Sequence, residues 1–159
     1  MLTIREYDPD LHRKAVRSLL IELLDSEKAA EPEWPSGREI AGPYFRWMMR
    51  RSRKYSGKIL VAEEEGRVIG FVSVLGRILP SDPDEYKKEY ALITDLVVSE
   101  RFRSRGVGRL LISLAEQYAR DYGVNTIRLQ ATAGNHRGRR FYAAVGYREL
   151  VVELFKKLE

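Results

Sequence analysis

The first part of the chain carries apolar residues at helical spacing. The apolar stripe consists of Val16, Leu19, Leu20, Leu23 and Leu24. Its intervals of three, one, three and one residues predict a helix that is buried on one face. Asp8-Pro9 supplies an N-cap and a proline for its first turn, after a short strand over residues 3–7. Residues 25–34 turn acidic and irregular. Ser36 and Glu39 then form a capping box for a second helix. Pro43 would kink or delay that helix, so the sequence does not fix its first residue.

Three β-rich runs follow, over residues 58–64, 67–79 and 90–98. Glu65-Gly66 joins the first two runs, and glycine accepts the positive φ that a tight hairpin turn requires. These two runs therefore predict an antiparallel hairpin. A polar loop over residues 80–88 precedes the third run, whose content of Ile, Leu and Val predicts a strand well inside the sheet.

The rest of the chain predicts two more helices and two more strands. One helix face is marked by Val107, Leu110, Leu111, Leu114 and Tyr118, and this helix should end near Tyr122-Gly123. A strand over 126–131, a short helix from Gly134 or Asn135 to Gly146, and a last strand over 147–155 complete the pattern. The order β-α-α-β-β-β-α-β-α-β, with no linker or repeat, predicts a single α/β domain of mixed α+β type over residues 1–159.

Composition narrows the class of protein. The 159 residues include no cysteine, which excludes disulfides and thiolate zinc sites and fits a reducing compartment. No charged-then-apolar signal pattern opens the chain, and no apolar run approaches the ~20 residues of a membrane-spanning helix. We therefore expect a cytoplasmic protein with no metal and no membrane partner.

Basic residues outnumber acidic ones by 28 to 23 and gather in two places. One cluster comprises Arg50, Arg51, Arg53 and Lys54, and the other Arg101, Arg103, Arg105 and Arg109. The second surrounds Gly106 and Gly108, between a predicted strand and a predicted helix. Because the first amides of a helix lack internal partners and glycine lets a ligand approach the backbone, this turn predicts a seat for two phosphates. A solvated helix start with glycine used for packing is the alternative.

Known phosphate-binding motifs fit this turn unequally. A P-loop requires Gly-x-x-x-x-Gly-Lys-Ser/Thr, and the dinucleotide fingerprint requires a third glycine where Leu111 stands. Instead, Leu96-Val-Val98 followed by Arg103-Ser-Arg-Gly106-Val-Gly108 strongly resembles the GNAT acetyltransferase superfamily. A second motif of that family is matched, with Gly138 in place of its alanine, by Asn135, Phe141, Tyr142, Gly146 and Tyr147.

The resemblance implies the GNAT acyl-CoA N-acyltransferase fold: three αβα layers and a mostly antiparallel sheet that is splayed open near residues 90–98. It also implies an acetyl-CoA-dependent N-acetyltransferase acting on a primary amine. The cofactor-binding residues that it implies are Leu96, Val97, Val98, Arg103, Ser104, Arg105, Gly106, Val107, Gly108, Arg109, Asn135 and Tyr142. In such a protein Leu96 and Val98 pair with the pantetheine arm, the amides of residues 103–109 hold the pyrophosphate, and Asn135 contacts the pantetheine or the sulfur side.

Attack of an amine on a thioester requires a proton acceptor and a proton donor. The resemblance assigns the donor to Tyr142, for which a role as a core aromatic is the alternative. Family members that use a strand carboxylate as the general base can carry it at the position of Leu92. Leucine cannot accept a proton, so this assignment does not apply to the present chain. Asp95 is the only ionisable residue within the strand and is either the base or a cap for a backbone group. A β-bulge could re-aim it.

The acceptor should lie between the first two helices and the hairpin, which the cofactor motifs leave unassigned. Carboxylates and an aromatic ring occur there, namely Asp25, Glu27, Glu31, Glu33 and Trp34. They would suit a small cationic or polar amine, unless they form only an acidic surface loop. The predicted last strand has no hairpin after it, and its free edge predicts a homodimer.

Two other functions compete with the transferase. A GNAT-fold regulatory protein that binds acetyl-CoA without turnover is compatible with Leu92, although Tyr142 speaks against it. A basic nucleic-acid-binding module is compatible with the net charge of +5. The aromatic residues argue against this module, because most occupy buried spacings and do not alternate with arginine along one strand face.

Overall fold

Five strands form one sheet in the computed structural model, which describes residues 1–83 and 88–159, in the order β1-β2-β3-β4-β5. The strands are β1 (Leu2–Glu6), β2 (Lys58–Glu64), β3 (Arg67–Ile78), β4 (Tyr90–Val98) and β5 (Ile127–Arg128). The first four pair antiparallel, whereas β4 and β5 are parallel. The predicted hairpin is confirmed, with Glu65 and Gly66 both at positive φ. The predicted loop over 80–88 includes residues 84–87, which lie outside the described residues.

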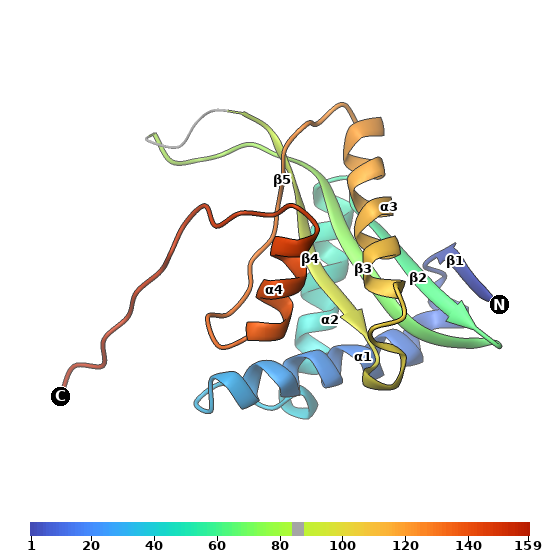
Figure 1. Ribbon diagram of the computed structural model, residues 1–159, viewed down its shortest axis with the longest axis horizontal. Coiled ribbons are helices and arrows are strands. Elements are labelled where there is room, and N and C mark those ends of the chain that lie inside the picture. Colours follow the sequence, from blue (N-terminus) through green and yellow to red (C-terminus); the bar gives the residue numbers. More distant parts are fainter. Residues whose placement is uncertain (84–87) are drawn as a thin grey trace.

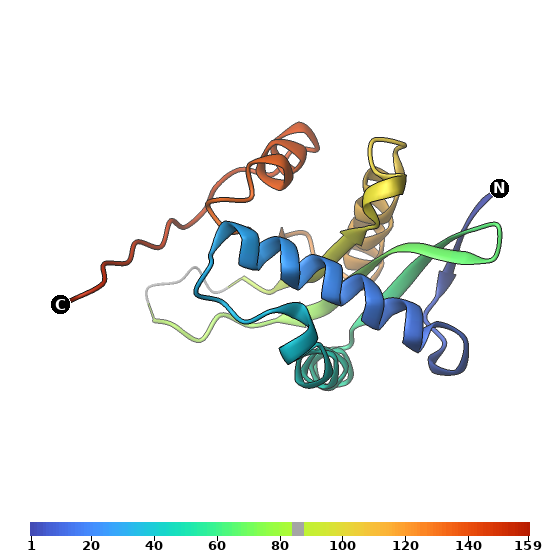
Figure 2. The same ribbon diagram turned by 90° about the horizontal axis from the view of Figure 1, so that it is seen from below.

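Helices cover both faces of the sheet (Figures 1 and 2). They are α1 (Pro9–Ala30), α2 (Gly37–Lys54), α3 (Val107–Asp121) and α4 (His136–Ala144), with a 3₁₀ turn η1 (Glu100–Phe102) between β4 and α3. Helices α1 and α2 lie on one face, and α3 and α4 lie on the other (Figure 2). The predicted three-layer αβα arrangement is therefore confirmed.

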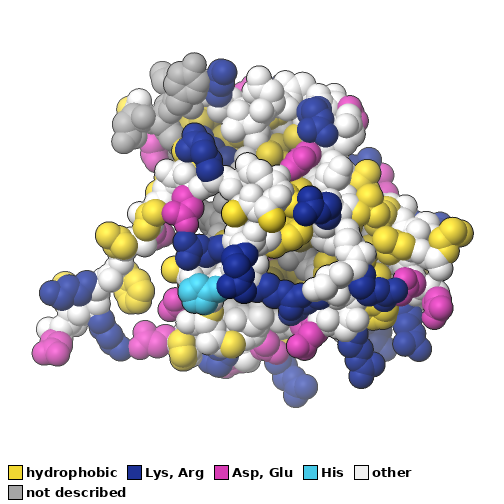
Figure 3. Space-filling view, in the orientation of Figure 1, with side chains coloured by type: hydrophobic (Ala, Val, Ile, Leu, Met, Phe, Trp, Pro, Cys, Tyr) yellow, Lys and Arg dark blue, Asp and Glu magenta, His cyan; other side chains and the backbone are white. Residues whose placement is uncertain are grey.

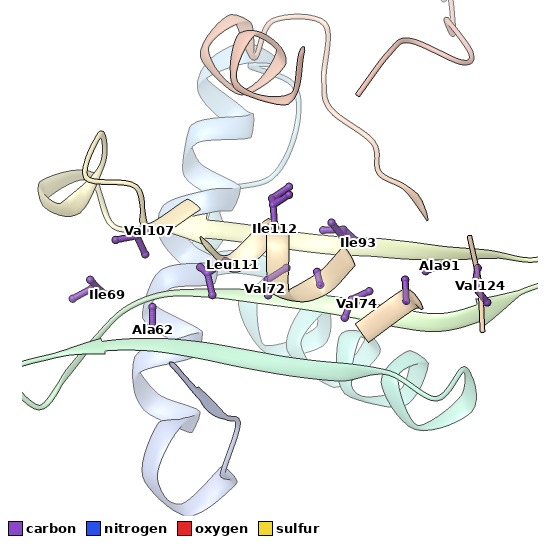
Figure 4. Close-up of a cluster of buried hydrophobic side chains, with 12 residues drawn as sticks. Ala62, Ile69, Val72, Val74, Ala91, Ile93, Val107, Leu111, Ile112 and Val124 are labelled. Atoms are coloured by element: carbon purple, nitrogen blue, oxygen red, sulfur yellow. The ribbon is translucent and has the colours of Figure 1, made fainter. Parts of the chain in front are cut away.

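Two apolar cores hold these layers together. Leu111 and Ile112 of α3 pack in a cluster with Val72 of β3 (Figure 4). On the opposite face, Leu20 of α1 packs in a cluster with Phe71. Each such side chain contributes about 1.5–3 kcal/mol when it is fully buried, so both helix layers are fixed against the strands that carry the site.

Local sequence signals explain where the first two helices begin. Asp8 caps α1 through its side chain, and Ser36 and Glu39 form the predicted capping box of α2. Helix α1 continues through Ala30, so the segment expected to be irregular from residue 25 is largely helical. Its Glu, Lys and Ala residues are strong helix formers. Pro43 lies inside α2, which loses one backbone hydrogen bond there and nevertheless continues.

The sheet is splayed open beside the second half of β4. Strand β5 pairs with β4 only at Ala91 and Leu92, and residues 93–98 then run on without β5 as a neighbour. The predicted opening near this strand is thereby confirmed. None of the described helices is both long enough and apolar enough to cross a membrane.

The predicted last strand over residues 147–155 is wrong. The structure has no strand after β5 among residues 129–159, and the end of the chain extends away from the sheet (Figure 1). Strand β5 is itself shorter than the predicted run over 126–131. A strand requires the N–H and C=O groups of a neighbour, and two residues of β5 offer few. The tail therefore exposes apolar side chains, Val151, Leu154 and Phe155 among them.

Candidate functional site

A β-bulge in β4 decides where Asp95 lies. The pairing of β3 with β4 shifts by one residue between Asp95 and Ile93, which leaves Thr94 without an opposing residue. Ile93 belongs to the core under α3, whereas Val97 belongs to the core under α1 and α2. Since regular alternation would put both on one face, the extra residue has reversed the pattern. The bulge places Asp95 on the face of α1 and α2.

Asp95 is buried and only half satisfied. The residue is 3% exposed to solvent. Its Oδ1 accepts a hydrogen bond of 2.6 Å from the Tyr44 hydroxyl on α2. Its Oδ2 is buried with no hydrogen-bond partner among the described residues. Burial raises the pKa of Asp95, and this effect outweighs the hydrogen bonds and the Arg51 charge that act in the opposite direction. The carboxylate can therefore accept a proton more readily than an exposed aspartate.

Two further ionisable groups approach Asp95 from other elements. Burial and then the Asp95 charge raise the pKa of Glu27 on α1. Burial, followed by the charges of Asp95 and Glu27, raises the pKa of Tyr142 on α4 to about 12. The phenol of Tyr142 is therefore protonated at neutral pH and can act as a donor. Its ring also lies 5.5 Å from that of Phe141, which fits the core role considered as the alternative.

The glycine turn after β4 has the geometry of an anion site. Gly106 caps α3 with φ of 84°, and Ser104 has φ of 61°. Such left-handed residues, beside a helix start with unpaired N–H groups, direct successive amides into a concavity that suits anions. A Cβ on Gly106 would meet no atom within 4 Å, whereas one on Gly108 would lie 3.4 Å from Phe141. Gly106 therefore borders open space, and Gly108 serves packing.

The arginines around this turn have different partners. Arg103 lies 3.5 Å from Glu22 of α1, and Arg105 forms two hydrogen bonds of 3.0 and 3.1 Å with Glu64 of β2. The other two arginines of the predicted cluster form no ion pair with any described residue. Lys and Arg side chains border the hollow between α3 and α4 (Figure 3). Positive charge thus remains where a phosphate would be attracted.

The free edge of β4 presents backbone groups beside the turn. The N–H of Ser99 donates to Ile69 of β3 at 2.8 Å, so the backbone groups of Leu96 and Val98, two alternate residues, face the other edge. Strand β5 has already diverged there. Arg103 donates through Nε to the Val98 carbonyl at 2.9 Å. An extended ligand could add to this edge, and at Val98 it would compete with Arg103.

Comparison with known families identifies the family to which β4, the glycine turn and α3 belong. The acetyltransferase (GNAT) family model matches residues 19–147, from α1 to the end of α4. The chain belongs to the GNAT acetyltransferase family. The resemblance carried by the two sequence motifs is therefore confirmed.

Relatives of this GNAT chain agree with that assignment. The uncharacterized N-acetyltransferase YhfO of Bacillus subtilis is 31% identical over 103 residues, which are 65% of this chain and 66% of YhfO. The chain thus spans slightly less than two thirds of that relative. A mutant of the BH1408 protein from Bacillus halodurans is similar in structure, with a TM-score of 0.84 at 20% identity over 99% of both chains. Aminoglycoside N-acetyltransferase AAC(6')-Iy in complex with CoA has a TM-score of 0.69 at 18% identity over 99% of both chains.

The second GNAT motif is tied to the first by side-chain contacts. Asn135 accepts the N–H of Gly138 at 2.9 Å and so caps α4. A Cβ on Gly138 would lie 2.4 Å from the Asn135 side chain, so an alanine there would require this side chain to shift. Arg137 donates to the Ser104 hydroxyl at 3.3 Å and joins α4 to the glycine turn. The Asn135 oxygen is thus engaged by its own helix.

The acidic residues expected to form one acceptor site are dispersed. Asp25 accepts the N–H of Gly37 at the start of α2, and Glu33 pairs at 2.7 Å with a lysine of the exposed tail. Glu31 terminates α1, and Trp34 is exposed. Among the five, only Glu27 influences the pKa of another group of the site. These residues therefore do not form a single pocket, because Asp25 and Glu27 lie on α1 whereas Glu31, Glu33 and Trp34 follow its end.

A row of three α2 side chains that begins at Asp95 was not connected with the site from the sequence. Tyr44 contacts Asp95, the ring centroid of Trp47 lies 5.4 Å from that of Tyr44, and the Arg51 guanidinium lies 4.6 Å from the Trp47 ring. Their spacing of three and four residues was a signal for a shared helix face. Nothing local showed that this face meets the β4 bulge.

Proposed function

We propose that this GNAT chain transfers the acetyl group of acetyl-CoA to the primary amine of a small polar molecule in the cytoplasm. The observation that carries the proposal is the convergence of Asp95, Glu27 and Tyr142 from three elements beside the open edge of β4. Family membership supports the reaction, and the CoA bound to AAC(6')-Iy, which shares this fold, supports the thioester substrate.

The residues present fit acetyl-CoA. The amides of residues 103–109 and the uncompensated arginines of the turn would bind the pyrophosphate, and Gly106 leaves the space that it needs. The edge at Leu96–Val98 would pair with the pantetheine arm, as in strand addition to a sheet. Asn135, at the start of α4, would flank that arm. Bound acetyl-CoA would bring its thioester toward Tyr142 and Asp95.

The two ionisable side chains would divide the proton transfers. The amine nitrogen forms a bond to the acetyl carbon, the carbon–sulfur bond breaks, and one proton leaves the amine while the thiolate gains one. Asp95 would accept the first proton, directly at Oδ2 or through the Tyr44 hydroxyl. Tyr142 would donate to the thiolate. Because an ordinary thiol has a pKa of about 8.5, a phenol of higher pKa stabilises the thiolate chiefly by hydrogen bonding.

Wild-type protein should release CoA thiol from acetyl-CoA when a suitable primary amine is added, and Tyr142→Phe should lower kcat by roughly 100-fold. The loss should be the same factor from pH 6.5 to 9, because a phenol with a pKa of about 12 stays protonated throughout. The dissociation constant for acetyl-CoA should change less than about twofold. Unchanged kcat would leave Tyr142 as a core aromatic. Acetyl-CoA binding without release with any amine would favour the regulatory alternative.

We also propose that the exposed tail joins two copies of the chain. Six of the nine residues over 150–158 are apolar and exposed, and a monomer rarely leaves so many neighbouring apolar side chains in water. Light scattering with size-exclusion chromatography should give a dimer mass for wild type and a monomer mass for Phe155→Asp. Glu153→Gln, in the same tail, should remain dimeric. A monomeric wild type at micromolar concentration would exclude the dimer.

A further inference from the structure

A continuous line of side chains on α2 leads away from Asp95. The Tyr44 hydroxyl contacts Asp95 at 2.6 Å, the Trp47 ring follows at 5.4 Å between centroids, and the Arg51 guanidinium lies over Trp47 at 4.6 Å. Residues spaced by three and four share one face of a helix. The transfer reaction proposed above uses Asp95 and Tyr44 but gives no role to Trp47 or Arg51.

Arg51 lies over the Trp47 ring and has no direct salt bridge to a carboxylate among the described residues. The side chain is half-buried, so part of the guanidinium is accessible to a ligand. An open pocket of about 360 Å³ lies at this end of the line, with walls formed by Trp47, Arg50, Arg51, Lys54 and Tyr55. Its lining contains three cations, two aromatic rings and no carboxylate. The positive charge of the pocket therefore favours binding of an anionic group.

The two ends of the line have opposite electrostatic character. Asp95 and Glu27 lie at one end, and the basic pocket lies at the other. The Arg51 charge acts on the pKa of both Asp95 and Tyr44, which shows that the two ends are within electrostatic reach. A molecule bound along the line would experience negative charge at one terminus and positive charge at the other.

We infer that the acceptor amine carries a second, anionic group, a carboxylate or a phosphate, and that Arg51 binds this group while the amine lies beside Asp95 and Glu27. The inference rests on the proposed acetyl transfer. Tyr44 and Arg51 are seven positions apart on the helix, which corresponds to about 10 Å along the axis. The acid and the amine are therefore several bonds apart. The Tyr44 and Trp47 rings cover the connecting atoms.

This geometry also excludes acceptors. A polyamine would place a second cation beside Arg50, Arg51 and Lys54, where like charges repel it. An α-amino acid would be too short to reach from Asp95 to Arg51. A planar guanidinium favours oxyacid groups because it can donate two parallel hydrogen bonds to carboxylate or phosphate.

The test compares acceptors that differ only in the terminal group. CoA release is measured with 6-aminohexanoate against 6-aminohexanamide, and with 3-aminopropyl phosphate against 3-aminopropanol. Wild type should favour the anionic member of at least one pair by about 10-fold or more in kcat/KM, as expected for a hydrogen bond to a charged group. The pair that shows the larger preference tells whether the site takes carboxylate or phosphate.

Arg51→Gln should abolish this preference by raising KM for the anionic acceptor far more than KM for the neutral one. Because the Arg51 charge also lowers the pKa of Asp95, the two acceptors are compared at a pH at which Asp95 has lost its proton in both proteins. Arg53→Gln is the matched control, since Arg53 is exposed and lies off the shared face. Equal use of the two members by wild type, or equal loss for both in Arg51→Gln, would overturn the inference. If no amine supports CoA release, acetyl transfer fails, and calorimetric binding of 6-aminohexanoate by wild type but not by Arg51→Gln still decides the role of Arg51.

Discussion

Gly106→Trp should lower the affinity for acetyl-CoA by at least about 100-fold. Gly106 has φ of 84°, which an L-residue adopts only with strain, and the space beside it holds no protein atom within 4 Å. An indole placed there would fill the volume that the pyrophosphate needs and would cover the first amides of α3. Losing those charge-assisted hydrogen bonds removes several kcal/mol of binding, at about 1.5–3 kcal/mol each. Isothermal titration calorimetry of both proteins with acetyl-CoA measures the change.

The matched control lies at the other end of the same helix. Gly123 follows α3 with φ of 85°, and a Cβ there would meet only the end of the flexible Arg77 side chain at 3.8 Å. Gly123→Trp therefore imposes similar backbone strain but leaves the turn open, so its affinity for acetyl-CoA should match wild type. Circular dichroism melts show whether both variants fold. A folded Gly106→Trp protein that binds as tightly as wild type would reduce the turn to a solvated helix start.

Features encoded within a few residues were predictable from the sequence. The Ser36–Glu39 capping box, the hairpin at Gly66 and the glycine turn at Gly106 each depend on the residue type at one position and on its immediate neighbours. The two family motifs likewise lie in continuous segments. Their physical causes, helix capping and positive φ, act locally, so the sequence contains all the information that they need.

Features that depend on distant partners were not predictable. Residues 147–155 have the apolar and β-branched content of a strand, but β5 is too short to pair with them. The face on which Asp95 lies follows from the register between β3 and β4, which the alternation of β4 alone does not reveal. The contact of Tyr44 with Asp95 joins residues 51 positions apart. The acceptor side of the site was therefore harder to predict than the phosphate side.

Asp95→Asn should lower kcat by about 100-fold or more and remove the acidic limb of the pH-rate profile. In wild type, activity should rise with pH as Asp95 loses its proton, and burial places that limb above the pH at which an exposed aspartate ionises. Asparagine can accept the Tyr44 hydrogen bond but cannot take a proton from the amine. Steady-state CoA release from pH 5 to 9 measures both effects. An intact limb in the variant would assign it to another group, of which Glu27 is the neighbouring candidate.

The same substitution should stabilise the fold at neutral pH. A raised pKa means that the native state binds a proton more tightly than the unfolded state, so wild-type stability falls as pH rises from about 4, the unfolded value, through the native pKa. Asparagine does not ionise, so Tm of Asp95→Asn should exceed that of wild type at pH 8. The difference should close as the pH falls toward 4. A variant less stable than wild type at pH 8 would identify Asp95 as a structural anchor for Tyr44.

Tyr44→Phe separates two ways in which Asp95 could receive the proton. The Tyr44 hydrogen bond lowers the pKa of Asp95, so its loss should raise that pKa further and move the acidic limb to higher pH. If the amine reaches Oδ2 directly, activity above the limb should remain within a few-fold of wild type. If the proton passes through the hydroxyl, that activity should fall as far as it does in Asp95→Asn. Oδ2 accepts no hydrogen bond from any described residue, whereas the Tyr44 hydroxyl donates to Oδ1. Both routes therefore predict the same shift of the acidic limb, and the rate above the limb distinguishes them.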